Sequence, residues 1–537
     1  MPKTFTADTE LNLEADVLVI GGGPAGTWAA FSAASGGAKV ILVDKGYCGT
    51  TGCAAASGNG VWYVPPSLEA REAAMASREA LGGFLADRTW MQRVLDQTYS
   101  NVNMLAQWGY PFPTDEAGQP YRRSLQGPEY MRLMRQQIKR AGVKILDHSP
   151  ALQLLVDENG AVSGATGVNR QSGEKWQIKA IAVIIATGGC AFLSKALGCN
   201  VLTGDGYLMA AEAGADMSGM EFSNAYGISP AFSSVTKTLF YRWATFTYED
   251  GTPIPGAGSQ KGRSVIAKTL LEQPVYAILD QATEEMRGAM RSAQPNFFLP
   301  FDRAGIDPFT QRFPVTLRLE GTVRGTGGIR ITDHTCATSV PGLYAAGDAA
   351  TRELICGGFT GGGSHNAAWA ISSGYWSGQG AAEYAKNQGE RTNQRHVQGV
   401  GEATLQPQGN QNLDVNATIQ AVQAEVFPYD RNLFRTTEGL TDSLTRLDHL
   451  WQEIRSSQAE NSQIIRAREA AAMVATARWM YNSALERKET RGMHKHLDYP
   501  EQDANQQHHL ISGGLDQVWV KSQPLKNAEK SLVGAAV

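Results

Sequence analysis

The alternation of apolar and polar positions near the start of the chain predicts a βαβ unit. Residues Ala15–Ile20 form a short apolar run that leads into a glycine-rich turn. The small-residue segment Thr27–Ser35 is expected to be a helix, and Ala38–Val43 a second strand that ends at Asp44. These elements follow one another within about 30 residues, the length of one βαβ unit. The pattern therefore predicts an α/β fold at the start of the chain.

The hydrophobic pattern predicts further elements downstream. Asn101–Gln107 and Glu129–Ala141 have the character of helices. Ala151–Val156 and Val162–Asn169 flank a polar turn, which predicts a hairpin. Ile178–Ala186 is largely apolar, as expected for a strand of a parallel sheet that is buried on both faces.

Changes in this pattern predict the domain organisation. At 537 residues the chain is too long for one hydrophobic core, so several domains are expected. The α/β rhythm stops near residue 216 and returns at Gly342–Ala346, and the segment between is rich in aromatics and turns. Lys386–Asn416 is rich in Gln, Asn and Gly, whereas Ile419–Arg487 has helical periodicity. We expect a nucleotide-binding domain in two parts (14–215 and 319–385), an inserted α+β capping domain (216–318), a linker (386–415), and a C-terminal helical domain with a tail (416–537).

Charge and cysteine content narrow the possible partners. The net charge is −4, which gives no argument for nucleic acid or an anionic membrane surface. The six cysteines include no CxxC pair, so we expect no zinc site and no iron–sulfur cluster on this chain. Their sparse distribution favours a reducing cytoplasm over a disulfide framework. We also expect no signal peptide and, because no stretch of 18 apolar residues occurs, no membrane span.

The glycine-rich turn carries the first candidate chemistry. Gly21-Gly22-Gly23-Pro24-Ala25-Gly26 fits the GxGxxG pattern between a strand and a helix. In such a motif the first glycine permits the tight turn, the second lets the backbone approach a pyrophosphate, and the third permits close packing of helix on strand. Asp44 follows at the end of the second strand, where it is placed to bind a ribose hydroxyl. At this stage NAD and FAD fit equally well.

Three further motifs separate these cofactors. They are ATGG at Ala186–Gly189, TGDG at Thr203–Gly206 and PGLYAAGD at Pro341–Asp348. In this order they resemble the FAD-binding family that includes fumarate reductase, succinate dehydrogenase, L-aspartate oxidase and the adenylylsulfate reductase flavoprotein. The segment RKETRG at Arg487–Gly492 also resembles the helical C-terminal domain of L-aspartate oxidase and its relatives. The resemblance extends from about residue 14 to 500, and it implies a Rossmann-type FAD-binding domain with a capping domain.

The resemblance also implies which residues hold FAD. Asp348 would meet the ribityl chain, Asp205 would lie near the cofactor, and the helix that begins at Gly361–Asn366 would face the flavin pyrimidine edge. Capping of local turns is the alternative role for Asp205 and Asp348. The loop Lys45–Gly60 contains no histidine that could anchor the flavin, so we expect non-covalent FAD. The expected FAD-binding residues are Gly21, Gly23, Pro24, Ala25, Gly26, Asp44, Lys45, Thr51, Gly52, Ala186, Thr187, Gly188, Asp205, Gly347, Asp348, Ser364 and Asn366.

Three residues are candidates for the catalytic site. The segment Gly262–Gln281 resembles the family's capping segment with its essential arginine, which assigns that role to Arg263. An ion pair at the surface or between domains is the alternative for this residue. His365 could approach the flavin or be a packed histidine, and Tyr226 could donate a proton or be a core aromatic.

Other positions of the family's dicarboxylate site differ in this chain. Tyr226-Gly227 stands where the family has a His-Pro pair, Gly361–Gly363 replaces the second arginine, and Val323 or Arg324 lies near the place of a histidine. A buried carboxylate without a partner is strongly disfavoured, so we expect a small anionic substrate that is neither succinate nor fumarate. Arg352 could supply part of the missing charge.

The electron partner remains open at this point. No second GxGxxG follows a strand, so no separate NAD(P)H domain is evident. A protein, a quinone and oxygen all fit, and one alternative is a flavoprotein subunit that passes electrons to a ferredoxin-like iron–sulfur protein. Another is a scaffold that holds FAD without redox chemistry.

Overall fold

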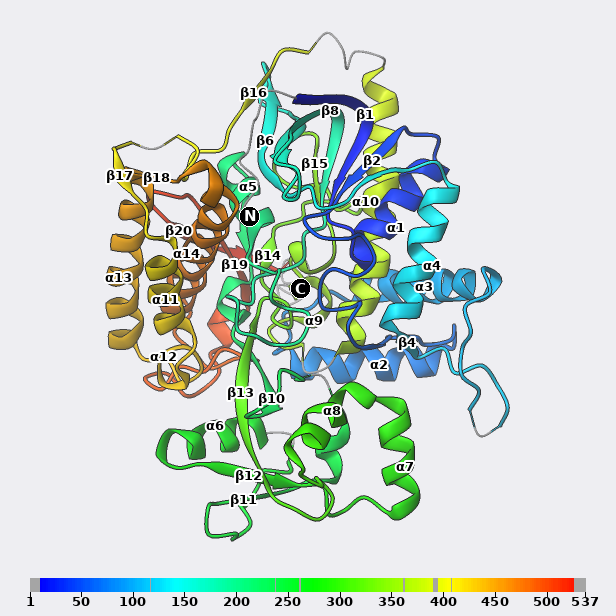
Figure 1. Ribbon diagram of the computed structural model, residues 1–537, viewed down its shortest axis with the longest axis vertical. Coiled ribbons are helices and arrows are strands. Elements are labelled where there is room, and N and C mark those ends of the chain that lie inside the picture. Colours follow the sequence, from blue (N-terminus) through cyan, green and yellow to red (C-terminus); the bar gives the residue numbers. More distant parts are fainter. Residues whose placement is uncertain are drawn as a thin grey trace, which may run out of the picture.

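A large mixed sheet forms the upper part of the molecule in Figure 1. The computed structural model describes residues 10–115, 117–236, 238–259, 262–360, 363–389, 395–406 and 408–525. Within this part, eight strands run in the order β16-β6-β7-β8-β1-β2-β5, and β15 pairs with β8. They are β1 (Glu10–Ile20), β2 (Val40–Val43), β5 (Lys144–Leu146), β6 (Ala151–Asp157), β7 (Val162–Val168), β8 (Lys175–Ile185), β15 (Leu343–Ala345) and β16 (Val397–Gly399).

β8 connects two kinds of strand pairing. Its first half pairs antiparallel with β7, and its second half pairs parallel with β15, while β1 runs parallel to it along nearly its whole length. The predicted hairpin of β6 and β7 and the parallel pair of β1 and β2 are confirmed. β1 begins at Glu10, earlier than its apolar run suggests, because Glu10–Glu14 pair with Lys175–Lys179 of β8.

Two helices pack closely on one face of this sheet. α1 (Pro24–Ser35) and α10 (Gly363–Gln388) approach backbone to backbone: a Cβ at Gly374 would lie 2.4 Å from the Ala25 carbonyl oxygen, and one at Gly378 2.3 Å from that of Ala29. Only glycine permits this distance, so the two positions hold the first turns of α1, which follow the glycine-rich loop, against the middle of α10. The other helices of this region are α2 (Leu68–Leu81), α3 (Arg88–Gln107), α4 (Gly127–Arg140), α5 (Asp205–Glu212) and α9 (Glu353–Cys356), with the short pair β3 (Gly58–Gly60) and β4 (Ser124–Gln126).

The inserted segment forms a second sheet with its own helices, at the bottom of Figure 1. Its strand order is β10-β13-β12-β11, and Phe240, Phe297, Phe298 and Phe301 pack around one another in its core. The long strand β13 leads from this sheet back towards the large one. The elements are β10 (Ala225–Pro230), β11 (Thr245–Thr247), α6 (Gly262–Glu272), β12 (Val275–Ile278), α7 (Glu284–Ala293), α8 (Pro295–Ala304) and β13 (Phe313–Gly321).

The C-terminal part is mainly helical, as expected, but it ends in strands. Its helices are α11 (Val415–Val426), α12 (Tyr429–Asn432), α13 (Thr437–Ser456) and α14 (Ile464–Glu486), with the short parallel pair β17 (Gln411–Asn412) and β18 (Ser457–Gln458). The expected tail contains a hairpin, β19 (His508–Gly513) and β20 (Trp519–Pro524), which joins β9 (Met217–Ser218) and β14 (Gly328–Ile329) in a third sheet. The expected linker also differs in part, because α10 continues to Gln388 and β16 pairs with β6. These strands were missed because their sequences are short and polar.

The RKETRG motif joins the C-terminal part to the remainder of the protein. Arg487 donates to Glu221 at 2.8 Å and to Glu489 at 2.9 Å, and Arg491 donates to Glu489 at 2.5 Å. All four side chains are buried. Removing one member would leave an uncompensated charge inside the protein, so the motif couples the C-terminal helices to the segment around Glu221.

None of the described helices is both long and apolar enough to cross a membrane.

Candidate functional site

The glycine-rich loop leaves open space at the start of α1. Gly21 has φ +111°, and a Cβ there would lie 2.3 Å from the Ala186 carbonyl oxygen. A Cβ at Gly26 would lie 1.8 Å from the Gly21 carbonyl oxygen, whereas one at Gly23 would meet no atom within 4 Å. The N-cap Gly23 provides no side chain to the first N–H groups of α1, and Pro24 follows it. Uncapped N–H groups beside open space at a helix N-terminus fit a pyrophosphate.

Asp44 closes this loop from the end of β2. Its side chain is buried, and its carboxylate accepts hydrogen bonds of 2.7 Å from the backbone N–H groups of Gly22 and Gly46. These contacts hold the carboxylate at the carboxyl edge of the sheet, and a carboxylate retains acceptor capacity for a ribose hydroxyl.

Lys45 and Asp205 are brought together. The Lys45 ammonium lies 2.7 Å from the Asp205 carboxylate and 3.1 Å from Glu469 on α14. Burial lowers the pKa of Lys45, but the two carboxylates outweigh it and the net shift is upward. The charge of Lys45 is therefore committed to these two side chains, which supports an orienting role beside the nucleotide rather than direct charge on it.

The other expected FAD-binding loops meet at the same edge of the sheet. Gly347 packs on α1, where an added Cβ would lie 2.7 Å from the Cβ of Ala25. The Thr187 hydroxyl lies against Gly206, and the Ala186 N–H donates to the Ile20 carbonyl. Gly188 (φ +77°) follows, while Gly52 (φ +87°) faces open space and Thr51 hydrogen-bonds to the Tyr47 backbone.

Asp348 pairs with Arg352 four residues later. Arg352 is buried, and its guanidinium also donates to the carbonyls of Thr322 and Val323 at 3.1 Å. These bonds fix the loop after β15 to the end of β13. Arg352 is therefore engaged by the protein itself, which argues against its use as a substitute cation for substrate.

The first turn of α10 carries His365 and its neighbours. The Ser364 carbonyl accepts from the Trp62 N–H at 3.1 Å, and Asn366 donates to the Val323 carbonyl at 3.0 Å. The His365 ring lies 4.6 Å from the Trp62 ring, and its Nε2 has no hydrogen-bond partner. Burial, with the charges of Arg78 and Arg352, lowers the pKa of His365 to about 3. His365 is therefore neutral at physiological pH. Positions 361 and 362 of the expected triple glycine lie outside the described residues.

Arg263 lies in the first turn of α6. Its side chain is exposed to solvent, yet the surrounding protein and the charge of Arg324 lower its pKa to about 10. Among the described residues Arg263 has no hydrogen bond or ion pair, so its guanidinium is available to a ligand.

Arg324 lies close enough to Arg263 to affect its charge, and it was not among the site residues predicted from the sequence. It follows β13 and lies 3.0 Å from Glu320, whose carboxylate is fully buried and accepts from the Thr236 hydroxyl at 2.7 Å. Arg324 and Glu320 both act on the charge of Arg263. The one sequence signal was the position of Arg324 near the place of a family histidine; its proximity to Arg263 depends on the course of β13.

Tyr226 points away from this group. Its hydroxyl donates to the Val426 carbonyl at 2.9 Å, and its ring packs edge-on against Tyr429 at 5.5 Å. Burial raises its pKa well above the ordinary value. A phenol held by carbonyls of the C-terminal part favours a structural role for Tyr226 over proton donation.

Two family models match the chain. One is described as FAD binding domain and covers residues 16–225; the other is described as fumarate reductase flavoprotein C-term and covers residues 425–530. The first spans the glycine-rich loop, Asp44 and the β8 region, and the second spans the RKETRG motif. The open space at the uncapped end of α1 is consistent with the dinucleotide that the first model implies.

Comparisons with known proteins agree over almost the whole chain. One subunit of the CoM/CoB fumarate reductase of Methanothermobacter marburgensis is 24% identical over 91% of this chain and 95% of its own length. The L-aspartate oxidase of Streptomyces coelicolor is 26% identical over 91% and 90%.

Solved structures have the same fold. Escherichia coli quinol fumarate reductase aligns with a TM-score of 0.82 at 20% identity, covering 96% of this chain and 97% of the other. Adenylylsulfate reductase from Archaeoglobus fulgidus gives 0.77 at 18% identity, with 98% of each chain covered. The motifs, the family models and the fold lead to one conclusion: the chain belongs to the fumarate reductase and succinate dehydrogenase flavoprotein family and is an FAD-dependent oxidoreductase.

Proposed function

We propose that this protein transfers a hydride between a small anionic substrate and non-covalently bound FAD, with the substrate held at Arg263. Bound FAD supplies the two-electron chemistry. The observation that carries the proposal is the accessible but desolvated guanidinium of Arg263 beside Arg324. The proposed site lies between a discontinuous FAD-binding domain (14–215 and 319–385) and a capping domain (216–318).

Arg263, Arg324 and Glu320 have different roles in binding the substrate. The pKa of about 10 keeps Arg263 protonated at neutral pH, so it presents a planar cation that can bind a carboxylate or oxyanion with two hydrogen bonds. Glu320, itself held by Thr236, orients Arg324 through their 3.0 Å ion pair. Arg324 adds positive potential without losing its own partner, so substrate needs to satisfy Arg263 alone.

The position of the available cations supports a substrate other than succinate or fumarate. A four-carbon dicarboxylate needs donors or cations at both ends, because an unpaired buried carboxylate is strongly disfavoured. Arg263 and Arg324 lie on one side, and the buried Arg352 is engaged by Asp348 and backbone carbonyls. A ligand with one anionic group and a larger uncharged part is the better match.

An anaerobic substrate screen tests this proposal. Purified FAD-loaded protein is mixed with a panel of small anions, and bleaching of the flavin absorbance is followed. One or more monoanions should bleach the flavin, whereas succinate oxidation with an artificial acceptor and fumarate reduction with a reduced viologen should be negligible. Robust turnover of either dicarboxylate, with a Michaelis constant in the ordinary micromolar to millimolar range, would refute the substrate assignment.

A second candidate function concerns the electron partner. Several relatives are named as subunits, and adenylylsulfate reductase is among the similar structures. These names support a flavoprotein subunit that passes electrons to a separate ferredoxin-like iron–sulfur protein. Copurification of a brown, iron-containing partner from the native host would favour this alternative, and full turnover by the isolated chain with a soluble acceptor would disfavour it. The sparse cysteines support a cytoplasmic location for either activity.

A further inference from the structure

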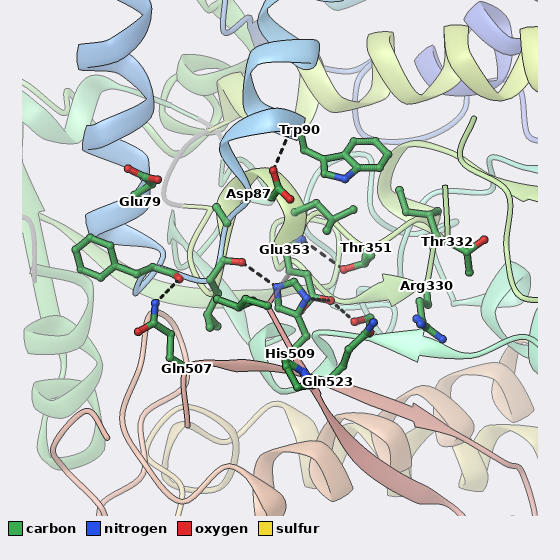
Figure 2. A pocket seen from close by; sticks show the side chains of 18 of the residues that line it. Glu79, Asp87, Trp90, Arg330, Thr332, Thr351, Glu353, Gln507, His509 and Gln523 are labelled. Carbon is green, nitrogen blue, oxygen red and sulfur yellow. Dashed lines mark hydrogen bonds and ion pairs between the residues drawn. The ribbon is translucent and has the colours of Figure 1, made fainter. Parts of the chain in front are cut away.

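A pocket lies away from the residues assigned to FAD and substrate (Figure 2). Its volume is about 580 Å³, and none of the residues proposed above lines it. Its walls come from the junction between α2 and α3, the segment after β14, the start of α9 and the C-terminal hairpin. The pocket therefore exists only because β19 and β20 pack against the FAD-binding region.

Glu353 is the buried charge of this pocket. Its side chain is almost fully buried, one carboxylate oxygen accepts from the Ser218 hydroxyl, and the other, Oε2, has no hydrogen-bond partner. Figure 2 shows Glu353 at the centre, next to His509, whose Nδ1 lies 3.9 Å from Oε1, the oxygen that accepts from Ser218. A buried carboxylate oxygen without a donor is costly, so the site is incomplete without one.

His509 does not supply that donor at this distance. Its Nε2 lies 2.8 Å from the Leu85 carbonyl and therefore carries a hydrogen in that bond. A neutral ring with hydrogen on Nε2 presents an acceptor, Nδ1, towards Glu353. The missing donor to Oε2 must therefore come from a ligand, and an ammonium group has enough hydrogens to donate to Oε2 and to a second acceptor of the pocket as well.

The other charges of the pocket are already engaged. Glu79 is held by Arg88 through bonds of 2.7 and 2.6 Å, and Arg330 pairs with Asp216 at 3.2 Å. Asp87 caps α3 by accepting from the Thr89 N–H. Glu353 is thus the uncommitted acidic group among the described lining residues.

Aromatic and aliphatic side chains line the remainder. Trp90 is nearly buried, Phe84 is 53% exposed, and Ile331, Leu354 and Pro524 complete this surface. An exposed phenylalanine at a pocket rim is available to cover a ligand, and tryptophan offers a flat face to an apolar body or a cation.

We propose that this pocket is a second ligand site that takes a small organic cation, with its ammonium group on Glu353 and its apolar body against Trp90 and Phe84. The site is coupled to the flavin region through the chain itself. Glu353 directly follows Arg352, and Arg352 holds Asp348 at the expected ribityl position. Occupancy therefore bears on the loop that contacts the cofactor, and it is independent of which substrate the flavin site accepts.

Three probes of similar shape and different charge test the proposal on FAD-loaded protein. Benzylammonium should bind and raise the unfolding temperature, benzyl alcohol should bind at least about tenfold more weakly because it lacks the charge, and benzoate should not bind. Binding is measured by saturation-transfer NMR and by thermal shift. Equal binding of the three probes, or no binding of benzylammonium at millimolar concentration, would overturn the proposal.

Variants locate the bound cation. Glu353→Gln keeps an acceptor for Ser218 but removes the charge, and it should weaken benzylammonium binding at least about tenfold. The matched control Glu79→Gln changes a lining carboxylate that Arg88 already neutralises, and its affinity should stay near wild type. Phe84→Ala, an exposed position, gives a second test if Glu353→Gln does not fold, and it should also weaken binding. Unchanged affinity in Glu353→Gln, or in Phe84→Ala, contradicts the assignment.

Discussion

The hydroxyl of Tyr226 donates a 2.9 Å hydrogen bond to the carbonyl of Val426, 200 residues further along the chain. This bond joins β10 of the capping sheet to the end of α11. The same carbonyl also accepts from the Asn432 amide at 2.9 Å, so it stays satisfied if the tyrosine hydroxyl is lost.

Tyr226→Phe should therefore cost about 1 kcal/mol of unfolding free energy, the usual value of one buried hydrogen bond, while turnover stays close to wild type. Chemical denaturation and steady-state kinetics measure the two effects. A large fall in kcat with unchanged stability would contradict the structural role and indicate that Tyr226 is a catalytic residue.

Changing the glycine-rich loop should reduce FAD binding without preventing folding. Gly23→Val places a side chain in the open space beside α1, where no protein atom lies within 4 Å, so the protein should fold and bind little FAD. Gly288→Val is the control, because Gly288 lies in a helix and also faces open space. Flavin content per chain, read from absorbance, should fall in the first variant only; wild-type content in Gly23→Val would show that the loop has another role.

FAD should be held without a covalent bond. The loop that follows β2 contains no histidine, and burial raises the pKa of the Cys48 thiol to about 12, which suppresses its nucleophilic form. Acid precipitation should release yellow FAD into the supernatant. Flavin fluorescence that stays on the denatured protein band would contradict this expectation.

The buried His365 should make stability depend on pH. Its pKa of about 3 in the folded protein lies below the ordinary value of 6.5, so between these values the unfolded chain binds a proton that the folded protein does not. Stability is therefore lost as the pH falls below 6.5, by about 2 kcal/mol at pH 5 for this group alone.

Denaturation at pH 7 and pH 5 checks this sign in wild type and His365→Gln. The variant should lose about 2 kcal/mol less than wild type on acidification, whatever its absolute stability. Equal losses in the two proteins would mean that His365 is protonated in the folded state.

The nucleotide loop could be predicted from the sequence because its determinants are local. A strand, a GxGxxG turn, a helix and Asp44 lie within one βαβ unit, and the glycines at 21 and 26 are required by contacts within or next to that unit. The inserted capping domain could be predicted for a similar reason, because its many aromatic residues lie in one stretch of sequence and form one core.

The catalytic geometry could not be predicted in the same way. Arg324 reaches Arg263 through the return of β13, and Tyr226 turns to α11, both of which depend on pairing between distant segments. The hairpin of β19 and β20 was missed because its strands are short and polar, and its partner β9 has two residues. The pocket around Glu353 is lined in part by that hairpin, so it could not be predicted from the sequence either.

Removal of the Arg263 guanidinium tests the central claim most directly. With a monoanion that bleaches the wild-type flavin, Arg263→Ala should reduce the rate of bleaching by at least about a hundredfold, because a cation that acts on developing charge is lost. Dithionite should still bleach the bound FAD in this variant, and the control Arg303→Ala, an exposed arginine at the end of α8, should react like wild type. Near wild-type bleaching by the substrate in Arg263→Ala would remove Arg263 from the site and contradict the account.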